Sequence, residues 1–250
     1  MNGMIFQPPP RRPAEYTGCF QLQCACEHGS CTVRFHNVER SAGAILFTHG
    51  NAEDLGLNNE QFCSQLVAAT GFCVLAVEYC GYGPTRDERA PSELCCLANA
   101  LAGYRWLVEQ RYITSDRIYL FGRSLGCVPV CRLATKQPCA GLILCSPFYS
   151  AREMARHLVG PTLALLGSAF VNLNGFANSK AAPHVPCRVF IAHGQQDDVV
   201  PISQAERLSN LFPGQVTRYW TPAGHNDMFS SMNWEMLLQQ LIPWLRQTKK

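Results

Sequence analysis

Short apolar runs alternate along this chain with longer segments in which apolar positions recur at helical spacing. The apolar runs predict buried strands at 42–50, 72–79, 117–121, 141–148, 187–194 and 215–224. The amphipathic segments between and after them predict helices at 55–70, 92–111, 127–135, 203–212 and 234–247. Continuous apolar strands that alternate with such helices indicate an α/β fold, in which a mostly parallel sheet is covered on both faces.

Local signals refine two of these helices. The helix predicted at 92–111 begins after Ser92, a residue type that commonly caps helix N-termini. Within 203–212, Ser203 and Glu206 have the spacing of a capping box. The helix at 92–111 places five apolar residues on one stripe, which we expect to face the sheet: Leu94, Leu97, Leu101, Tyr104 and Val108.

Composition supports a single globular domain over 1–250. Hydrophobic residues make up 47% of the 250 residues and charged residues 16%, which is unlike a disordered chain. We find no internal repeat and no linker, only a longer connection at 149–185 that we expect to form a short lid. The net charge of +3 is not gathered into a basic stripe, so we expect no nucleic-acid partner.

The chain has fourteen cysteines, most of them inside apolar runs. The sequence does not open with a secretory signal, so we expect reduced thiols and a cytoplasmic location. Cys24, Cys26, His28 and Cys31 could be interpreted as a zinc site. A β-hairpin over about 18–37 explains these residues better, because the second half of a metal knuckle is missing, and we expect neither a metal nor an organic cofactor.

No apolar run reaches the roughly 18 residues that a transmembrane helix requires. The second residue is Asn2, where an N-myristoylation signal needs glycine. We therefore predict no spanning segment.

The stretch "GRSLG" places Ser124 between two glycines, where a predicted strand turns into a predicted helix. An ordinary glycine-rich turn would explain it, but so would a nucleophile exposed on a tight turn. Asp197 and Asp198 follow the strand at 187–194, and His225 follows the strand at 215–224. In parallel sheets, ligands bind beyond the carboxyl ends of the strands. The order serine, aspartate, histidine at such ends is that of α/β-hydrolases, which favours the catalytic interpretation.

Several further motifs strengthen this interpretation. The segments "FTHGNAEDLG", "EYCGYG", "FGRSLGCVPV", "LILCSPF", "IAHGQQDDVVP" and "GHND" together resemble the α/β-hydrolase-domain-containing proteins of type seventeen and their wider relatives. These relatives are serine hydrolases and include protein depalmitoylases. The resemblance begins near Phe6, runs to the C-terminus and implies an α/β-hydrolase fold.

The resemblance implies roles for five residues. Ser124 would be the nucleophile and His225 the base. Asp197 would be the acid in preference to its neighbour, because the family pattern places the acid four residues after the histidine of "HG". The backbone amides of Asn51 and Leu125 would form the oxyanion hole. His49 and His193 are expected to brace their loops and take no part in the chemistry.

The predicted substrate is an acyl ester or acyl thioester, most specifically a long-chain acyl group such as palmitoyl on protein cysteines. Leu163, Leu166 and Phe170 lie in the 149–185 connection and could line an acyl pocket, although a core helix would explain them equally well. Family depalmitoylases carry an N-terminal cysteine cluster, whereas the first cysteine here is Cys19. Constitutive membrane anchoring is therefore not expected, and peripheral contact with a membrane stays open.

Three other functions compete with this one. A peptidase of the oligopeptidase or aminopeptidase kind would use the same triad, and so would a carboxylesterase for small esters. A non-catalytic binding module would have lost a triad residue, and none is missing here. A serine hydrolase that acts through an acyl-enzyme is the function that the sequence favours.

Overall fold

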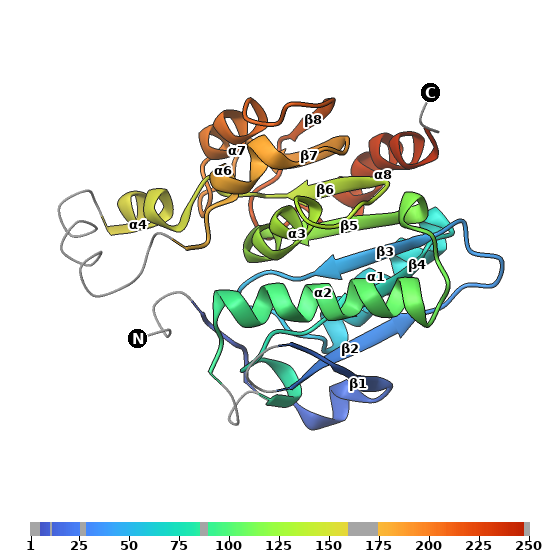
Figure 1. Ribbon diagram of the computed structural model, residues 1–250. Coiled ribbons are helices and arrows are strands. Elements are labelled where there is room, and N and C mark those ends of the chain that lie inside the picture. The colour runs from blue at the N-terminus through green and yellow to red at the C-terminus, as the bar shows by residue number, and fades with distance from the viewer. Residues whose placement is uncertain (1–5, 11, 26–28, 86–89, 160–174, 248–250) are drawn as a thin grey trace.

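The computed structural model describes residues 6–10, 12–25, 29–85, 90–159 and 175–247 (Figure 1). Its centre is an eight-stranded sheet with strand order β1-β2-β4-β3-β5-β6-β7-β8. Strands β1 and β2 pair antiparallel, β2 joins β4 antiparallel, and all later pairs are parallel. The strands are β1 (Cys19–Gln23), β2 (Ser30–His36), β3 (Ala44–Thr48), β4 (Cys73–Val77), β5 (Ile118–Arg123), β6 (Gly141–Cys145), β7 (Val189–Gly194) and β8 (Val216–Thr221).

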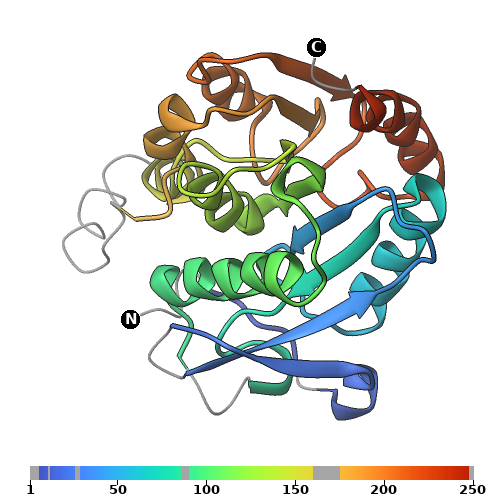
Figure 2. The ribbon, with the colours of Figure 1, turned by 45° about the vertical axis from the view of Figure 1, so that its right-hand side comes forward.

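Helices cover both faces of this sheet (Figures 1 and 2). They are α1 (Leu57–Thr70), α2 (Glu93–Glu109), α3 (Cys127–Ala134), α4 (Ala151–Val159), α6 (Asn178–Ala181), α7 (Ile202–Ser209) and α8 (Ser231–Arg246). Short 3-10 helices are η2 (Pro13–Tyr16), η3 (Gly83–Thr85), η4 (Ser115–Arg117), η5 (Ser124–Gly126) and η6 (Ala182–His184). The mostly parallel sheet with helices on both faces is confirmed.

Alternate residues of the central strands feed two separate cores. On β3, Leu46 packs in the core that contains residues of α2, α3, α6 and α7, whereas Ile45 and Phe47 pack in the core beneath α1 and α8. Every residue of β3, β4, β6 and β7 is buried. A strand buried on both faces has no side exposed to solvent, which is why apolar residues predominate in these segments.

The stripe predicted on α2 is correct except at its first residue: Tyr104 is buried, and Leu97, Leu101 and Val108 are partly buried against the core. Periodicity predicts that Leu94 faces the sheet, but this side chain is 75% exposed. The helix instead buries mostly small residues, and a Cβ added at Gly103 would lie only 2.9 Å from Cγ2 of Val77. The helix therefore lies close to the sheet, and this close approach selects small side chains. The predicted cap is confirmed, because the side chain of Ser92 accepts a hydrogen bond from the backbone N–H of Cys95.

The capping box predicted for α7 is wrong. This helix begins at Ile202, its N-cap is Pro201, and no side chain caps it. Ser203 therefore lies inside the first turn of the helix. Helix α8 begins at Ser231, three residues before the predicted start, and contains Pro243.

The connection at 149–185 contains α4, α6 and η6. Leu163, Leu166 and Phe170, the predicted acyl-pocket residues, lie outside the described residues. The cysteines that the structure describes are thiols, and most are buried. Within the described ranges, no helix is long and apolar enough to cross a membrane.

Candidate active site

The turn that carries Ser124 joins β5 to α3 through the 3-10 turn η5. Ser124 has φ of +49°, in the left-handed region that residues with a side chain rarely adopt. Its side chain remains partly exposed, although Leu125 and Gly126 beside it are buried. Strained backbone of this kind is common where a side chain must be presented for function.

The two glycines of "GRSLG" are explained by backbone crowding. A Cβ added at Gly122 would lie 2.4 Å from the carbonyl oxygen of Gly126. A Cβ at Gly126 would lie 2.1 Å from the carbonyl oxygen of Thr48, at the end of β3. The hydroxyl of Thr48 also donates a hydrogen bond of 2.8 Å to the Gly126 carbonyl oxygen. The serine turn is therefore pressed against the end of β3.

Asp197 and His225, which are 28 positions apart, form a buried hydrogen-bonded pair. Nδ1 of His225 lies 2.8 Å from Oδ2 of Asp197, and the two residues are 9% and 8% exposed. The other oxygen of Asp197 accepts the backbone N–H groups of Val199 and Val200 at 3.0 and 2.7 Å. Burial by itself would raise the pKa of Asp197, but the His225 hydrogen bond and the Val200 N–H outweigh it, so the pKa lies below its usual value.

The adjacent loop residues differ in their surroundings. Asp198 is exposed, whereas Asp197 is buried and contacts the histidine. His193 also approaches Asp197, with Nε2 at 3.4 Å from Oδ2 of Asp197 and at 2.8 Å from the carbonyl oxygen of Val200. Burial lowers the pKa of His193. Its contacts hold the turn that carries Asp197, as predicted from the sequence.

His49 braces the loop that follows β3. Its Nδ1 lies 2.8 Å from the carbonyl oxygen of Gly50, and its Nε2 lies 2.7 Å from Oε1 of Glu78. The Tyr79 hydroxyl donates a 2.6 Å hydrogen bond to the carbonyl oxygen of His49. Both His49 and Glu78 are fully enclosed, with exposures of 0% and 1%. This arrangement fits the bracing role predicted for His49.

Asn51 follows directly on the same loop. Its Oδ1 accepts hydrogen bonds from the Tyr82 hydroxyl at 2.7 Å and from the backbone N–H of Gln7 at 3.0 Å. Leu125 is 5% exposed and packs in a cluster that includes Tyr82 and Phe6. The segments of the two predicted oxyanion donors are therefore adjacent, and the N-terminal segment packs against both.

No hydrogen bond joins the hydroxyl of Ser124 to His225 in the part of the chain that the structure describes. The two turns are connected instead by Arg123, whose Nη2 donates to the carbonyl oxygen of His225 at 3.3 Å. In enzymes without substrate, catalytic hydrogen bonds are often long and tighten only in the complex. The structure thus joins the predicted acid and base directly, and it joins the serine turn to them through a neighbouring side chain.

Sequence reasoning missed three charged residues of this region: Glu53, Glu78 and Arg123. Each is mostly buried, with side-chain exposures of 19%, 1% and 14%. A carboxylate at the end of the apolar run "FCVLAVEY" was the one signal for Glu78, because an enclosed charge requires partners. No comparable signal marks Glu53, which lies in a polar loop.

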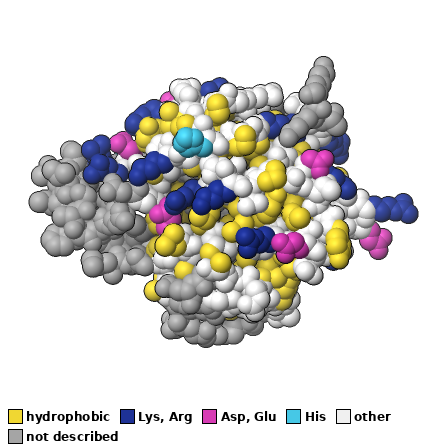
Figure 3. Space-filling view, viewed as in Figure 1, with side chains coloured by type: hydrophobic (Ala, Val, Ile, Leu, Met, Phe, Trp, Pro, Cys, Tyr) yellow, Lys and Arg dark blue, Asp and Glu magenta, His cyan; other side chains and the backbone are white. Residues whose placement is uncertain are grey.

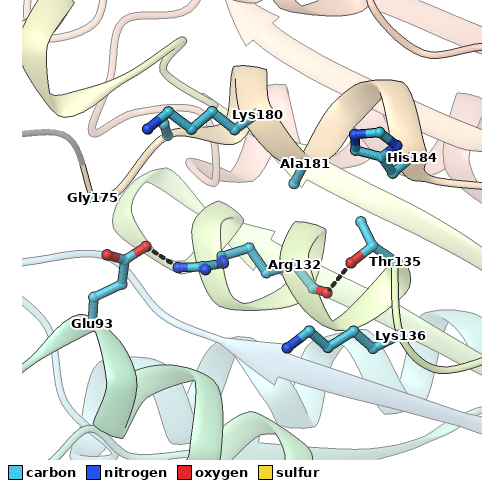
Figure 4. Close-up of a pocket in the computed structure, with 9 residues that line it drawn as sticks. Glu93, Arg132, Thr135, Lys136, Gly175, Lys180, Ala181 and His184 are labelled. Carbon is cyan, nitrogen blue, oxygen red and sulfur yellow. Dashed lines mark hydrogen bonds and ion pairs between the residues drawn. The ribbon is translucent and has the colours of Figure 1, made fainter.

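A cavity of about 430 Å³ lies elsewhere, between α2, α3 and the α6–η6 segment (Figure 4). Its lining includes Glu93, Arg132, Lys136, Lys180 and His184, and none of the predicted site residues. Basic side chains stand on this side of the sheet (Figure 3). Among the described residues, no group of three or more His, Cys, Asp or Glu side chains could hold a metal ion.

Comparison with known proteins identifies similar chains. The family described as "Serine aminopeptidase, S33" matches residues 39–188. The alpha/beta hydrolase domain-containing protein 17C of Xenopus tropicalis is 31% identical over 223 residues, which are 86% of this chain and 67% of that protein. The lysophosphatidylserine lipase ABHD12 of Danio rerio is 31% identical over 189 residues, 70% of this chain and 48% of that protein. The chain spans about half to two thirds of the length of the curated relatives it matches.

Among solved structures, the Pyrococcus furiosus esterase Pf2001 has a TM-score of 0.75 at 16% identity, covering 96% of this chain and 98% of that one. At this level of identity the likeness concerns the fold alone. Together with the family match, it confirms the α/β-hydrolase fold that the resemblance implied.

Proposed function

Because this chain belongs to the serine aminopeptidase S33 family of α/β hydrolases, we propose that it is a serine hydrolase that cleaves carboxylic ester or thioester bonds through an acyl-enzyme. One observation supports this most strongly. The hydrogen-bonded pair of Asp197 and His225 lies beyond the ends of β7 and β8, and Arg123 links it to the strained turn of Ser124.

The proposed reaction begins when the Ser124 hydroxyl oxygen attacks the acyl carbonyl carbon, while His225 takes the hydroxyl proton. Asp197 holds the imidazole in the tautomer that presents Nε2 to the serine, and it stabilises the imidazolium that forms. The carbonyl oxygen becomes an anion, which the backbone amides of Asn51 and Leu125 would stabilise by roughly 3 kcal/mol each. His225 then gives its proton to the departing alkoxide or thiolate. Water cleaves the acyl-enzyme by the same steps.

For the substrate we propose a long-chain acyl group, such as palmitoyl on a protein cysteine or an acyl chain on a glycerolipid. The similarity to a protein named as a lysophosphatidylserine lipase supports an acyl-ester substrate. We also propose that 1–250 forms one catalytic domain, that the 149–185 connection serves as its lid, and that Leu163, Leu166 and Phe170 line the acyl pocket. A cytoplasmic site of action with peripheral membrane contact would fit such substrates.

The family description keeps a serine aminopeptidase as the second candidate. The same triad would attack an amide, and only the leaving group would differ. Parallel assays with acyl thioesters, p-nitrophenyl esters of graded length and aminoacyl amides separate the candidates. Turnover of aminoacyl amides alone would replace the proposed substrate class with a peptidase.

The triad itself is tested with a fluorophosphonate probe, which labels activated serines. Ser124→Ala should abolish labelling, and His225→Ala should abolish turnover. Asp197→Asn should lower kcat by about 10⁴-fold, because the histidine loses its tautomer control. Asp198→Asn is the matched control, since this exposed neighbour makes no contact with the histidine among the described residues, and kcat should change little. Labelling that survives Ser124→Ala would contradict the proposed nucleophile.

The acyl pocket is tested by chain length. Each buried CH₂ contributes about 0.8 kcal/mol, so kcat/KM should rise about fourfold per added methylene until the pocket ends. Leu163→Asp or Leu166→Asp should depress long-chain turnover and leave acetyl ester turnover nearly unchanged. A profile that peaks at acetyl or butyryl esters would leave a small-ester carboxylesterase as the function.

A further inference from the structure

Arg123, the residue before the proposed nucleophile, directs its charged side chain into the protein. It is the last residue of β5, and its side chain is only 14% exposed. Burial lowers its pKa, while the charge of Asp197 acts in the opposite direction. A guanidinium stays protonated at any ordinary pH, so this site holds a permanent and largely enclosed positive charge.

One set of contacts reaches the oxyanion loop. The guanidinium forms an ion pair with Glu53. Oε2 of Glu53 accepts the backbone N–H of Gly50 at 3.0 Å, and a Cβ at Gly50 would lie 2.9 Å from its Oε1. Glu53 is therefore packed directly against the backbone that precedes Asn51, the proposed oxyanion donor.

A second set of contacts reaches the histidine loop. Nη2 of Arg123 donates to the carbonyl oxygen of His225 at 3.3 Å. The guanidinium carbon also lies 5.2 Å from the ring centre of Phe229. That ring packs on Phe62 of α1 and Trp234 of α8, at centroid distances of 4.7 and 5.8 Å. These contacts attach the histidine loop to α1 and α8, whose residues pack in one core on the same face of the sheet.

We propose that Arg123 is a positioning residue, which sets the spacing between the serine turn, the oxyanion loop and the histidine loop. It acts through Glu53 and through the carbonyl of His225, and it touches no reacting atom. The planar guanidinium has five N–H donors in a rigid fork, so it can bind two loops at once, which a lysine ammonium on its flexible stem does poorly. The proposal rests on the proposed function, because it assigns the three loops to one reaction.

The test uses the full chain with Arg123→Met and Arg123→Lys. A fluorophosphonate probe counts the competent serines, and kcat and KM are then measured on p-nitrophenyl butyrate per labelled serine. A displacement of about 1 Å in a reacting group can lower the rate about 10²-fold, so Arg123→Met should lower kcat by about 10²-fold with KM nearly unchanged. Arg123→Lys should recover part of kcat, because it keeps the charge opposite Glu53 but lacks the fork.

Glu53→Gln tests the connection to the oxyanion loop. It can still accept the Gly50 N–H but cannot form the ion pair, so kcat should fall. Because the pair acts as a unit, Arg123→Met combined with Glu53→Gln should lower kcat no further than Arg123→Met alone. If Arg123→Met does not fold, the single variants Glu53→Gln and Arg123→Lys test the proposal in its place.

Arg132→Met is the matched control. Arg132 of α3 forms an ion pair with Glu93 of α2 beside the cavity in Figure 4, so its loss also removes a bridge between two elements. Arg132→Met should leave kcat per labelled serine within about twofold of the wild-type value, as expected for sites that do not share partners.

Three outcomes decide whether Arg123 is a positioning residue. A lower kcat per labelled serine for the Arg123 variants, with partial recovery by lysine, supports the positioning role. Arg123 variants that lose thermal stability or labelled fraction but keep the wild-type kcat per labelled serine would reduce Arg123 to a structural residue. A folded wild-type chain that neither reacts with the probe nor cleaves the ester would refute the proposed function and this proposal with it.

Discussion

Glu78 offers the sharpest test of the structure, because its enclosed carboxylate holds three separate groups. It is 1% exposed. It lies 2.7 Å from Nε2 of His49 and accepts the backbone N–H groups of Leu55 and Tyr79, each at 2.9 Å. Replacing Glu78 with leucine would fill the site with an apolar side chain but would leave these three groups without an acceptor.

The expected cost follows from that inventory. A buried donor that loses its acceptor costs about 1–3 kcal/mol, so Glu78→Leu should lower the free energy of unfolding by roughly 3 kcal/mol or more. Native proteins are stable by only about 5–15 kcal/mol, so the loss would be a large fraction of the total. Glu78→Gln keeps one oxygen and turns an amide NH₂ toward the other donors, so its cost should be smaller, about 1–3 kcal/mol.

Urea denaturation measures the free energy of unfolding of both variants. A shift of the transition midpoint at an unchanged dependence on urea concentration reports a change in stability. Glu109→Gln is the matched control, because Glu109 is an exposed glutamate at the end of α2, and it should stay within about 0.5 kcal/mol of wild type. Buried charges can be replaced without loss when both partners change, but here His49 remains. A Glu78→Leu variant as stable as wild type would therefore refute the three-contact account.

Three further predictions follow from burial and backbone packing. Burial holds the pKa of His193 below its ordinary 6.5, so the unfolded chain takes up the proton first and stability should fall as pH decreases below about 6.5. His193→Gln should flatten that part of the pH profile in urea titrations, whereas exposed His184→Gln should leave its slope intact. Gly126→Ala places a methyl 2.1 Å from a backbone carbonyl, so probe labelling and melting temperature should both fall. Gly214→Ala meets only an atom at 3.6 Å and should be neutral, and an equal response from both would contradict the close packing. Burial raises the pKa of the Cys127 thiol, so iodoacetamide should modify it only after denaturation, as peptide mapping would show, and fast modification of the folded chain would oppose this.

The alternation of strands and helices can be read from the amino-acid sequence. In β3 and β4 every side chain is enclosed, so apolar residues predominate and the runs are easy to recognise. Parallel strands run in the same direction, so their carboxyl ends lie on one edge of the sheet, and residues that follow a strand meet there even when they are far apart along the chain. For this reason the amino-acid sequence predicts that Ser124, His225 and an aspartate of the pair Asp197 and Asp198 lie together.

Which residues of an element are buried depends on the surface that the element packs against, and this surface forms only in the folded chain. Periodicity located α2 but selected Leu94 for its buried face, whereas close approach to the sheet buried small residues and left Leu94 in solvent. The fold places Asp197, which the family pattern favours over exposed Asp198, against the histidine. Arg123 and His225 are 102 positions apart, so no local pattern records their contact. Local propensity and periodicity determine the elements, whereas long-range contacts between the ends of those elements decide which polar side chains meet.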